Sequence, residues 1–370
     1  MDALARALIE ILGPEAVRRD EPLAPYTTLR VGGPADLLAV ASGAEALRRA
    51  VRLAWERDAP CRVLGGGSNV LIGDAGVRGL VVLNRSGEVR FAGARVQAES
   101  GASLAALARR CIAQGLAGLE WAVGIPGTVG GAVVGNAGAW GGDVASVLHE
   151  AHILGPGGEV EVWPAARFEY GYRSGVLKGQ RGQRQAIVLR AEFALREEPR
   201  ERIEQRAAEI AARRRAAQPP GATCGSIFKN PPGDYAGRLI EAAGLKGERR
   251  GGAEISAHHA NFIVNRGGAT AADVWALIRL AQQRVRGRFG VGLELEIELV
   301  GWEIGKLVDW EGAGVGLCIE PCALSIVHWS LVIWTQGLVP ADLPDTRCCG
   351  TMDYGEIARW SHLWRAFRGT

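Results

Sequence analysis

The sequence predicts an α+β protein with three domains, and three patterns lead to this prediction. Segments with the apolar period of a helix alternate with short apolar runs typical of strands along the first 300 residues. Two glycine-rich stretches interrupt this alternation. A charged, alanine-rich helix ends at a Pro-Pro pair, which is typical of a domain boundary. A chain of 370 residues is too long for one small core and has room for two or three.

The domains are expected at 1–85, 86–198 and 223–301, with a helical connector at 199–222 and an atypical segment at 302–370. The helix predicted over 201–217 is interpreted as a connector between domains, because it lacks the broad apolar stripe of a helix that packs on a core.

Each expected element follows from its local pattern. Four apolar side chains on one face predict a helix over 2–19, and the alternating sequence LELEIELV predicts a closing strand over 293–300. Further helices are predicted at 43–57, 102–114, 201–217, 235–243 and 270–289. Strands or extended segments are predicted at 27–40, 62–64, 80–83, 90–99, 150–154, 159–163, 186–193, 260–265 and at the start of the third domain.

The composition excludes several classes of protein. A hydrophobic content of 48% and a charged content of 22% are typical of a globular domain. The formal charge of +3 is too small for a concentrated basic face, so no nucleic-acid partner is expected. No apolar run is long enough to span a membrane, and no secretory signal is visible. Seven cysteines, an odd number, indicate free thiols in a reducing compartment, and we expect a cytoplasmic protein.

The segment 302–370 differs from the rest of the chain. It holds four of the seven cysteines and six of the eleven tryptophans, and it has no clear helical or strand period. Two interpretations stay open: non-native sequence such as a shifted reading frame, or a lineage-specific appendage. Either interpretation predicts a poorly packed segment that adds nothing to catalysis.

The first glycine-rich stretch, Gly65, Gly66, Gly67, Ser68 and Asn69, directly follows a predicted strand. Consecutive glycines allow successive N–H groups to converge on an anion such as phosphate, although a simple tight turn would use the same residues. The stretch is neither a dinucleotide-binding G-x-G-x-x-G motif nor a P-loop.

The second glycine-rich stretch spans 124–142 and contains eight glycines among small apolar residues. This composition favours an ordered, buried loop over a polar linker. Together, the two stretches predict a binding site for one large dinucleotide, with its pyrophosphate between them. The alternative is a glycine-rich packing loop without a ligand.

The side chains that could take part in catalysis or ligand binding lie in three places. The sequence TCGSIFKNPP brings together Ser226, Lys229 and Asn230, and lysine is rare in a chain with 39 arginines and four lysines. This stretch is either a surface turn or the wall of a cleft. Arg173 follows Tyr172 and has the two-pronged donor geometry that suits a carboxylate or phosphate, or else a surface ion pair.

Three acids alternate on the closing strand, at Glu294, Glu296 and Glu298, so that all three point to one face. They form either a solvated face or a set in which one buried member does acid–base chemistry. No metal site is predicted. The adjacent His258 and His259 lack a third ligand, and the cysteines of the final segment have poor spacing for zinc.

Taken together and in order, these motifs resemble the UDP-N-acetylenolpyruvoylglucosamine reductase (MurB) family over about residues 20–301. The matching stretches are TTLRVGGPAD (27–36), LGGGSNVL (64–71), GIPGTVGGAVVGNAGA (124–139), YGYRSG (170–175), CGSIFKNP (224–231), AGRLIEAAGLKG (236–247), HHANFIVN (258–265) and LELEIELVG (293–301). No tyrosine lies between Arg173 and Ser226, so the chain is similar to the type II branch, which lacks an insertion carrying a substrate-covering tyrosine.

The resemblance implies a two-subdomain FAD-binding fold of the vanillyl-alcohol-oxidase type, followed by an α+β substrate-binding domain. It implies that NADPH reduces FAD and that UDP-N-acetylglucosamine enolpyruvate then accepts the hydride at C3, in peptidoglycan precursor synthesis. Arg173 and Glu296 match the family's residues that stabilise the developing charge, and Ser226 matches the serine that protonates C2. A monomer is expected.

The resemblance also assigns binding residues by position. Tyr172, Lys229, Asn230 and Asn261 are expected to contact the substrate. The residues expected to bind FAD are Gly65, Gly66, Gly67, Ser68, Asn69, Gly124, Ile125, Pro126, Gly127, Thr128, Gly130, Gly131, Asn136, Ala137 and Gly138. Two alternatives stay open: a flavin-dependent oxidase of the same fold that acts on another sugar, and a flavin-binding protein without catalysis.

Overall fold

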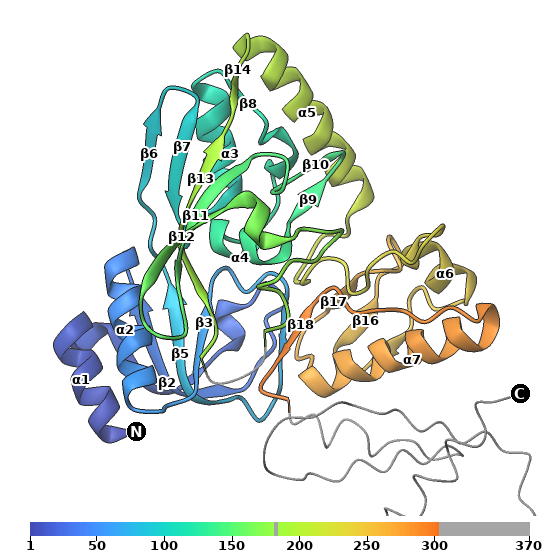
Figure 1. The fold of residues 1–370 in the computed structure, drawn as a ribbon. Helices are drawn as coiled ribbons and strands as arrows, with labels where there is room; N and C mark the ends of the chain where they lie inside the picture. Colours follow the sequence, from blue (N-terminus) through green and yellow to red (C-terminus); the bar gives the residue numbers. More distant parts are fainter. Residues whose placement is uncertain (181–183, 303–370) are drawn as a thin grey trace, which may run out of the picture. The chain divides into compact units, whose positions relative to one another are not determined.

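The computed structural model describes residues 1–180 and 184–302, and Figure 1 shows the arrangement of their helices and strands. The final segment from residue 303 onward, with its predicted poor packing and its four cysteines, lies outside the described residues. Trp302, the first residue of that predicted segment, is described. It packs against Trp275 and donates a hydrogen bond to the Leu71 carbonyl oxygen at 3.0 Å.

The N-terminal part is a mixed sheet in the strand order β1-β2-β5-β3 (Figure 1). β1 pairs antiparallel with β2, whereas β2 and β3 both run parallel to β5. The apolar faces of two helices cover this sheet, and their leucine, alanine and valine side chains are buried against it. The elements are α1 (Asp2–Leu12), β1 (Val17–Pro22), β2 (Pro34–Ala41), α2 (Ala44–Glu56), β3 (Cys61–Leu64), β4 (Val70–Ile72) and β5 (Val77–Asn84).

The next part is built on a five-stranded antiparallel sheet in the order β12-β11-β13-β7-β6. Its core lies between this sheet and the helices α3 and α4. The elements are β6 (Val89–Ala92), β7 (Arg95–Glu99), α3 (Leu104–Ala113), β8 (Leu116–Ala117), α4 (Val129–Gly135), β9 (Gly138–Ala139), β10 (Gly142–Asp143), β11 (Leu148–Leu154), β12 (Val160–Pro164), β13 (Ile187–Ala194) and β14 (Arg196–Glu197).

The helix α5 (Arg200–Ala217) packs against α3 and β8 of the preceding part, and the chain then enters a small α+β part. There α7 packs against β16, and α6 packs against α7 (Figure 1). A capping box of Thr270 and Asp273 starts α7. The elements are α6 (Ala236–Ala242), β15 (Arg249–Arg250), β16 (Ala253–Ile255), β17 (Ile263–Asn265), α7 (Ala271–Phe289) and β18 (Glu298–Val300).

Several contacts join this last part to the N-terminal part, including a strand pair and a helix cap. β18 pairs in parallel with β4, with Glu298 opposite Val70. The carboxylate of Asp74 accepts the first main-chain N–H groups of α7, from Ala271 at 2.7 Å and Ala272 at 2.9 Å. A carboxylate at this end of a helix satisfies free N–H groups and complements the helix dipole.

Several predicted elements are wrong in extent. Of the extended segment expected over 27–40, only Pro34–Ala41 forms a strand, and the strand expected over 90–99 is the antiparallel pair β6 and β7. The helix expected over 2–19 ends at Leu12, because Gly13 has φ +89° and Pro14 follows it, and the next residues form β1. The closing strand expected over 293–300 is regular only at Glu298–Val300. Before it, Leu295 makes a single bridge to Phe228.

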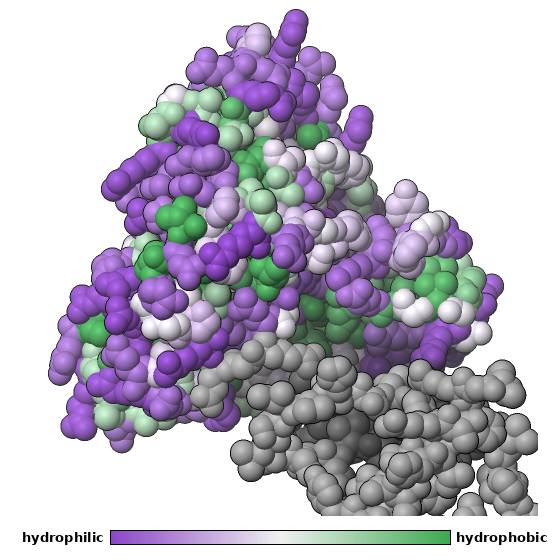
Figure 2. Space-filling view, viewed as in Figure 1, coloured by the Kyte–Doolittle hydropathy of each residue, from purple (hydrophilic) through white to green (hydrophobic). Residues whose placement is uncertain are grey.

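Across residues 1–180 and 184–302, no helix is both long and apolar enough to cross a membrane. Figure 2 shows a face on which hydrophilic residues dominate and apolar residues are scattered. Scattered apolar residues of this kind are normal on a protein surface.

Candidate active site

The two glycine-rich stretches pack directly against each other. A Cβ atom added to Gly66 would lie 2.9 Å from the Cα atom of Gly127, and one added to Gly65 would lie 2.4 Å from Thr128 Oγ1. The Ser68 hydroxyl donates a hydrogen bond to the Pro126 carbonyl oxygen at 3.2 Å. The glycines are therefore needed for the close approach of the two main chains.

Main-chain donors in the first stretch are free. The N–H groups of Gly66, Gly67, Ser68 and Asn69 make no hydrogen bond to any described residue. Gly67 adopts φ +60°, a left-handed conformation that turns neighbouring N–H groups toward a common point. Free donors beside a left-handed glycine suit an anion, and they favour the phosphate interpretation of this stretch over the simple turn.

The second stretch forms a loop and a short helix. Gly124, Ile125, Pro126 and Gly127 precede α4, and Thr128 caps it by accepting the N–H of Gly131 at 3.4 Å. The other predicted cofactor residues follow: Gly130 and Gly131 lie in the first turn of α4, and Asn136, Ala137 and Gly138 lead from α4 into β9.

Asn136 has a structural task that the sequence did not reveal. Its side chain is buried, donates to the Gly171 carbonyl oxygen at 3.0 Å and accepts the Ala145 N–H at 3.0 Å. Both ends of the amide are therefore bonded to the main chain. Asn136 ties the second glycine-rich stretch to the turn that carries Arg173.

Arg173 lies in a tight turn between Gly171 and Ser174, which exchange two main-chain hydrogen bonds. Its φ is +53°, a conformation that is uncommon for a residue other than glycine and is often found at functional sites. The guanidinium donates to the carbonyl oxygens of Asn136 and Gly138. The turn thus holds Arg173 against the second glycine-rich stretch.

Glu296 is brought to Arg173 from the other end of the chain. Arg173 Nε lies 2.9 Å from Glu296 Oε1, and both side chains are largely buried, with 22% and 18% of their surface exposed. The Arg173 N–H does not point along this contact, so Nε has no aligned hydrogen bond within the described residues. The contact is an ion pair that leaves a buried donor free.

The main chain of Glu296 is fixed by the first glycine-rich stretch. Asn69 Nδ2 donates to the Glu296 carbonyl oxygen at 3.1 Å, and the N–H of Glu298 donates to the Asn69 carbonyl oxygen at 2.9 Å. Lys178 Nζ donates to the same Glu296 oxygen at 3.3 Å. Asn69, predicted as a cofactor residue, therefore also positions Glu296.

Burial governs the ionisation of this cluster. It raises the pKa of Glu296, although Arg173, Lys178 and Lys229 act in the opposite direction. Burial lowers the pKa of Lys178, with nearby Glu296 opposing the shift. The neutral forms of both groups are therefore easier to reach than on an exposed surface.

Ser226 lies on an extended segment between two neighbours. It bridges to Phe262, and the next residue, Ile227, accepts the N–H of Glu296 at 2.8 Å. Ser226 is partly exposed, and its hydroxyl makes no hydrogen bond to a described residue. Ser226, the predicted proton donor, is thus the neighbour in sequence of the residue whose main chain is hydrogen-bonded to Glu296.

Asn261, predicted as a substrate contact, has both ends of its side-chain amide bonded to the main chain. Asn261 is 4% exposed; its Oδ1 accepts the Phe228 N–H at 2.9 Å and its Nδ2 donates to the Phe228 carbonyl oxygen at 2.8 Å. Since both ends of the side chain are used and buried, Asn261 is a positioning residue. It holds the segment that carries Ser226 and Lys229.

The other predicted substrate residues lie nearer the surface. Lys229 Nζ is 2.5 Å from Glu294 Oε1, and Tyr172 is exposed with its ring 5.7 Å from the Arg173 guanidinium carbon. Asn230 is exposed, and its Oδ1 accepts the Ala236 N–H at the start of α6 at 3.1 Å. The Asn230 amide nitrogen is not used in this contact.

The family models that match the chain are the UDP-N-acetylenolpyruvoylglucosamine reductase C-terminal domain, over residues 217–300, and an FAD binding domain, over residues 35–162. Reductases of that name from Chloroflexus aggregans and Rubrobacter xylanophilus are 45% and 47% identical, over 78% and 77% of this chain and 98% and 96% of their own. The crystal structure of the Thermus caldophilus enzyme is 40% identical with a TM-score of 0.66, and the match covers 77% of this chain and 98% of that one.

The chain belongs to the UDP-N-acetylenolpyruvoylglucosamine reductase family. The α+β fold class with an FAD-binding part and a C-terminal family domain, predicted from the sequence, is confirmed. Membership also confirms the predicted resemblance over most of the chain.

The residues of this family member fit FAD. The free N–H groups of residues 66–69 suit the pyrophosphate of a dinucleotide. The residues that would hold the cofactor are those of the two stretches, 65–69 and 124–138.

Lys178 is a site residue that the sequence interpretation missed. Lysine is rare in this chain, and the rarity that singled out Lys229 also marks Lys178, five residues after Arg173. Its partner, however, is a main-chain oxygen 118 positions away, which no side-chain pattern encodes.

Substitution of Gly66 tests the contact between the two stretches. Gly66→Ala should reduce the FAD content of the purified protein several-fold, because the new Cβ would force two main chains apart. The flavin absorbance per protein is the measurement. Gly287→Ala, on the exposed side of α7 and outside both stretches, is the matched control, because a Cβ atom there meets no atom within 4 Å. Equal FAD content in both variants would show that the contact does not shape the cofactor site.

The pH dependence of stability tests the ionisation of Glu296. Folding raises its pKa above the ordinary 4.5, so its stabilising contribution is complete below that pH and is lost as the pH rises through the raised value. Glu296→Gln mimics the protonated form and escapes this loss. The variant should match the wild-type Tm near pH 4 and exceed it by a few degrees at neutral pH.

Thermal unfolding of the two proteins across this pH range is the measurement. Glu298→Gln, an exposed change two residues along, should show no such trend. A variant that becomes less stable than the wild type as the pH rises would show instead that the ion pair with Arg173 outweighs burial.

Proposed function

We propose that this protein reduces UDP-N-acetylglucosamine enolpyruvate to UDP-N-acetylmuramate at the expense of NADPH, in peptidoglycan precursor synthesis. The observation that carries the proposal is the buried Arg173–Glu296 pair, held beside both glycine-rich stretches. FAD, when bound, supplies the chemistry of accepting a hydride from NADPH and delivering it to C3 of the substrate. The protein's own residues handle charge and protons.

Arg173 binds the enolpyruvyl carboxylate in this proposal. Its Nε donor is buried and has no aligned partner within the described residues, and such a donor is costly unless a ligand satisfies it. Negative charge spreads onto the carboxylate as C3 gains a hydride. A guanidinium fixed in advance by two carbonyl oxygens stabilises that charge without reorganising.

Glu296 takes part in its protonated form. An ionised carboxylate would repel the developing charge, whereas a carboxylic acid can donate a hydrogen bond to it. The raised pKa of Glu296, caused by burial, makes the acid form more accessible. Lys178 and Asn69 hold the main chain of Glu296 in place for this task.

Ser226 delivers the proton to C2. A hydroxyl is a weak acid, but it can protonate a strongly basic carbanion when it is aligned at a site from which water is excluded. Asn261 holds the neighbouring main chain, so that the Ser226 segment is fixed before the substrate arrives. Lys229 and the free amide nitrogen of Asn230 bind the polar part of the substrate, with Tyr172 at its edge.

We further propose that the protein acts as a cytoplasmic monomer, because its substrate is a nucleotide sugar and the face shown in Figure 2 is mostly hydrophilic. A flavin oxidase of the same fold or a non-catalytic flavin protein would need neither Ser226 nor the Arg173–Glu296 pair.

Rapid-mixing measurements of the two half-reactions, FAD reduction and FAD reoxidation, test the proposal. Ser226→Ala should leave FAD reduction by NADPH unchanged and slow reoxidation by the enolpyruvyl substrate by about 10²- to 10⁴-fold, because it removes the proton donor. Ser226→Cys, which keeps a donor, should recover part of that rate.

The wild-type protein provides the control. If NADPH reduces its flavin and the enolpyruvyl substrate does not reoxidise it, the proposed function is wrong. If Ser226→Ala slows neither half-reaction, the function stands and Ser226 is not the acid.

A further inference from the structure

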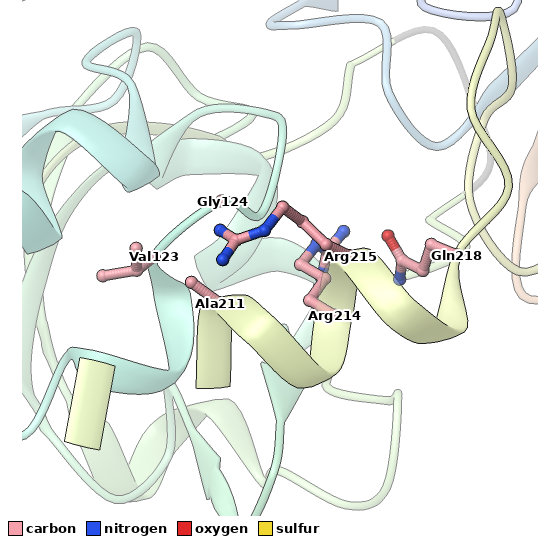
Figure 3. A pocket seen from close by; sticks show the side chains of 6 residues that line it. All are labelled: Val123, Gly124, Ala211, Arg214, Arg215 and Gln218. Atoms are coloured by element: carbon pink, nitrogen blue, oxygen red, sulfur yellow. The ribbon is translucent and has the colours of Figure 1, made fainter. Parts of the chain in front are cut away.

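A pocket of about 270 Å³ lies beside the second glycine-rich stretch, between its first residue and the last turns of α5 (Figure 3). Its lining consists of Val123, Gly124, Ala211, Arg214, Arg215 and Gln218. Two of the six lining side chains are guanidinium groups and none is acidic. The mechanism proposed above does not use this pocket.

The arginines of the pocket have no acidic partner among the described residues. The acids of α5 all lie in its first ten residues, where Arg200 pairs with Glu204 and Arg206 pairs with Glu120. By contrast, neither Arg214 nor Arg215 makes an ion pair or a side-chain hydrogen bond with a residue in 1–180 or 184–302. Positive charge is thus concentrated at one end of the helix.

Arg214 is also partly withdrawn from water. Burial lowers its pKa, and no acidic group opposes the shift. The helix dipole favours cations in the last turn, but an exposed side chain such as Arg213 meets that preference fully. The dipole therefore does not explain a guanidinium held in a pocket without a counter-charge. A partly buried cation of this kind is stabilised when an anion binds.

The position of the pocket suggests which anion binds. A Cβ atom on Gly124 would lie 3.5 Å from Arg214 Cδ, so Arg214 packs against the beginning of the predicted cofactor loop. The pocket thus adjoins the second glycine-rich stretch, which forms one wall of the candidate active site.

We propose that Arg214, with Arg215, binds a phosphate group of a nucleotide that enters and leaves this site. The inference rests on the proposed function, which supplies two such ligands: NADPH, with a 2′-phosphate and a diphosphate, and the sugar nucleotide, with a diphosphate. A guanidinium offers two parallel donors to phosphate oxygens, and Gly124, which lacks a side chain, lets Arg214 lie close to the main chain of the loop.

Steady-state kinetics of the FAD-loaded full chain with Arg214→Met test the proposal. Arg213→Met is the matched control, because Arg213 is exposed on the same turn and does not line the pocket. Arg214→Met should raise a nucleotide KM about ten- to a hundredfold with little change in kcat, Arg214→Lys should restore part of the loss, and Arg213→Met should behave as the wild type.

The choice of nucleotide identifies the phosphate. A loss with NADPH but not with NADH assigns the 2′-phosphate, whereas a loss with both dinucleotides and the sugar nucleotide assigns the diphosphate. Inorganic pyrophosphate provides a readout without turnover: it should raise the Tm of the wild type and of Arg213→Met, but not that of Arg214→Met.

Three results would overturn the proposal. They are unchanged KM values in Arg214→Met, a pyrophosphate effect on Tm that survives that change, or a loss confined to FAD content. A wild-type protein that does not turn over at all would instead overturn the proposed function, so the two failures are distinguishable.

Discussion

The parallel pairing of β18 with β4 is the constraint on which the candidate site depends. Glu296 precedes β18, and Asn69 precedes β4, so the pairing brings two residues separated by 227 positions into contact. The carbonyl oxygen of Glu296 then accepts from both Asn69 and Lys178. Without this junction the glycine-rich stretch and the carboxylate would belong to separate parts of the chain.

The same junction explains why the charges of the site are not fully compensated by one another. Arg173 is fixed in a left-handed turn by its bonds to Asn136 and Gly138, and it meets a glutamate whose burial favours the neutral form. A site that fully satisfied both charges would gain nothing from a charged ligand. Instead, Arg173 and the first glycine-rich stretch have hydrogen-bond donors without partners among the described residues. Donors positioned in advance in this way are typical of sites where charge develops during a reaction.

The sequence predicted the parts of this site better than their connections. Glycine runs, a lone lysine and an alternating Glu strand leave visible patterns, and the family resemblance joined them. By contrast, Asn136, Asn261 and Lys178 bond main-chain atoms of distant segments, and the identity of those segments leaves no trace in the pattern. The N-terminal helix was predicted too long, although its end can be recognised from the local sequence, because Gly13 and Pro14 are a helix stop signal.

The central claim is that Asn69 and Glu296 work as one unit, and a double-mutant cycle tests it most directly. The rate of flavin reoxidation by the enolpyruvyl substrate would be measured for wild type, Asn69→Ala, Glu296→Ala and the double variant, each loaded with FAD. The account predicts that the double variant is scarcely slower than Glu296→Ala alone, because Asn69 acts through the position of the Glu296 side chain. Two losses that multiply independently would contradict it.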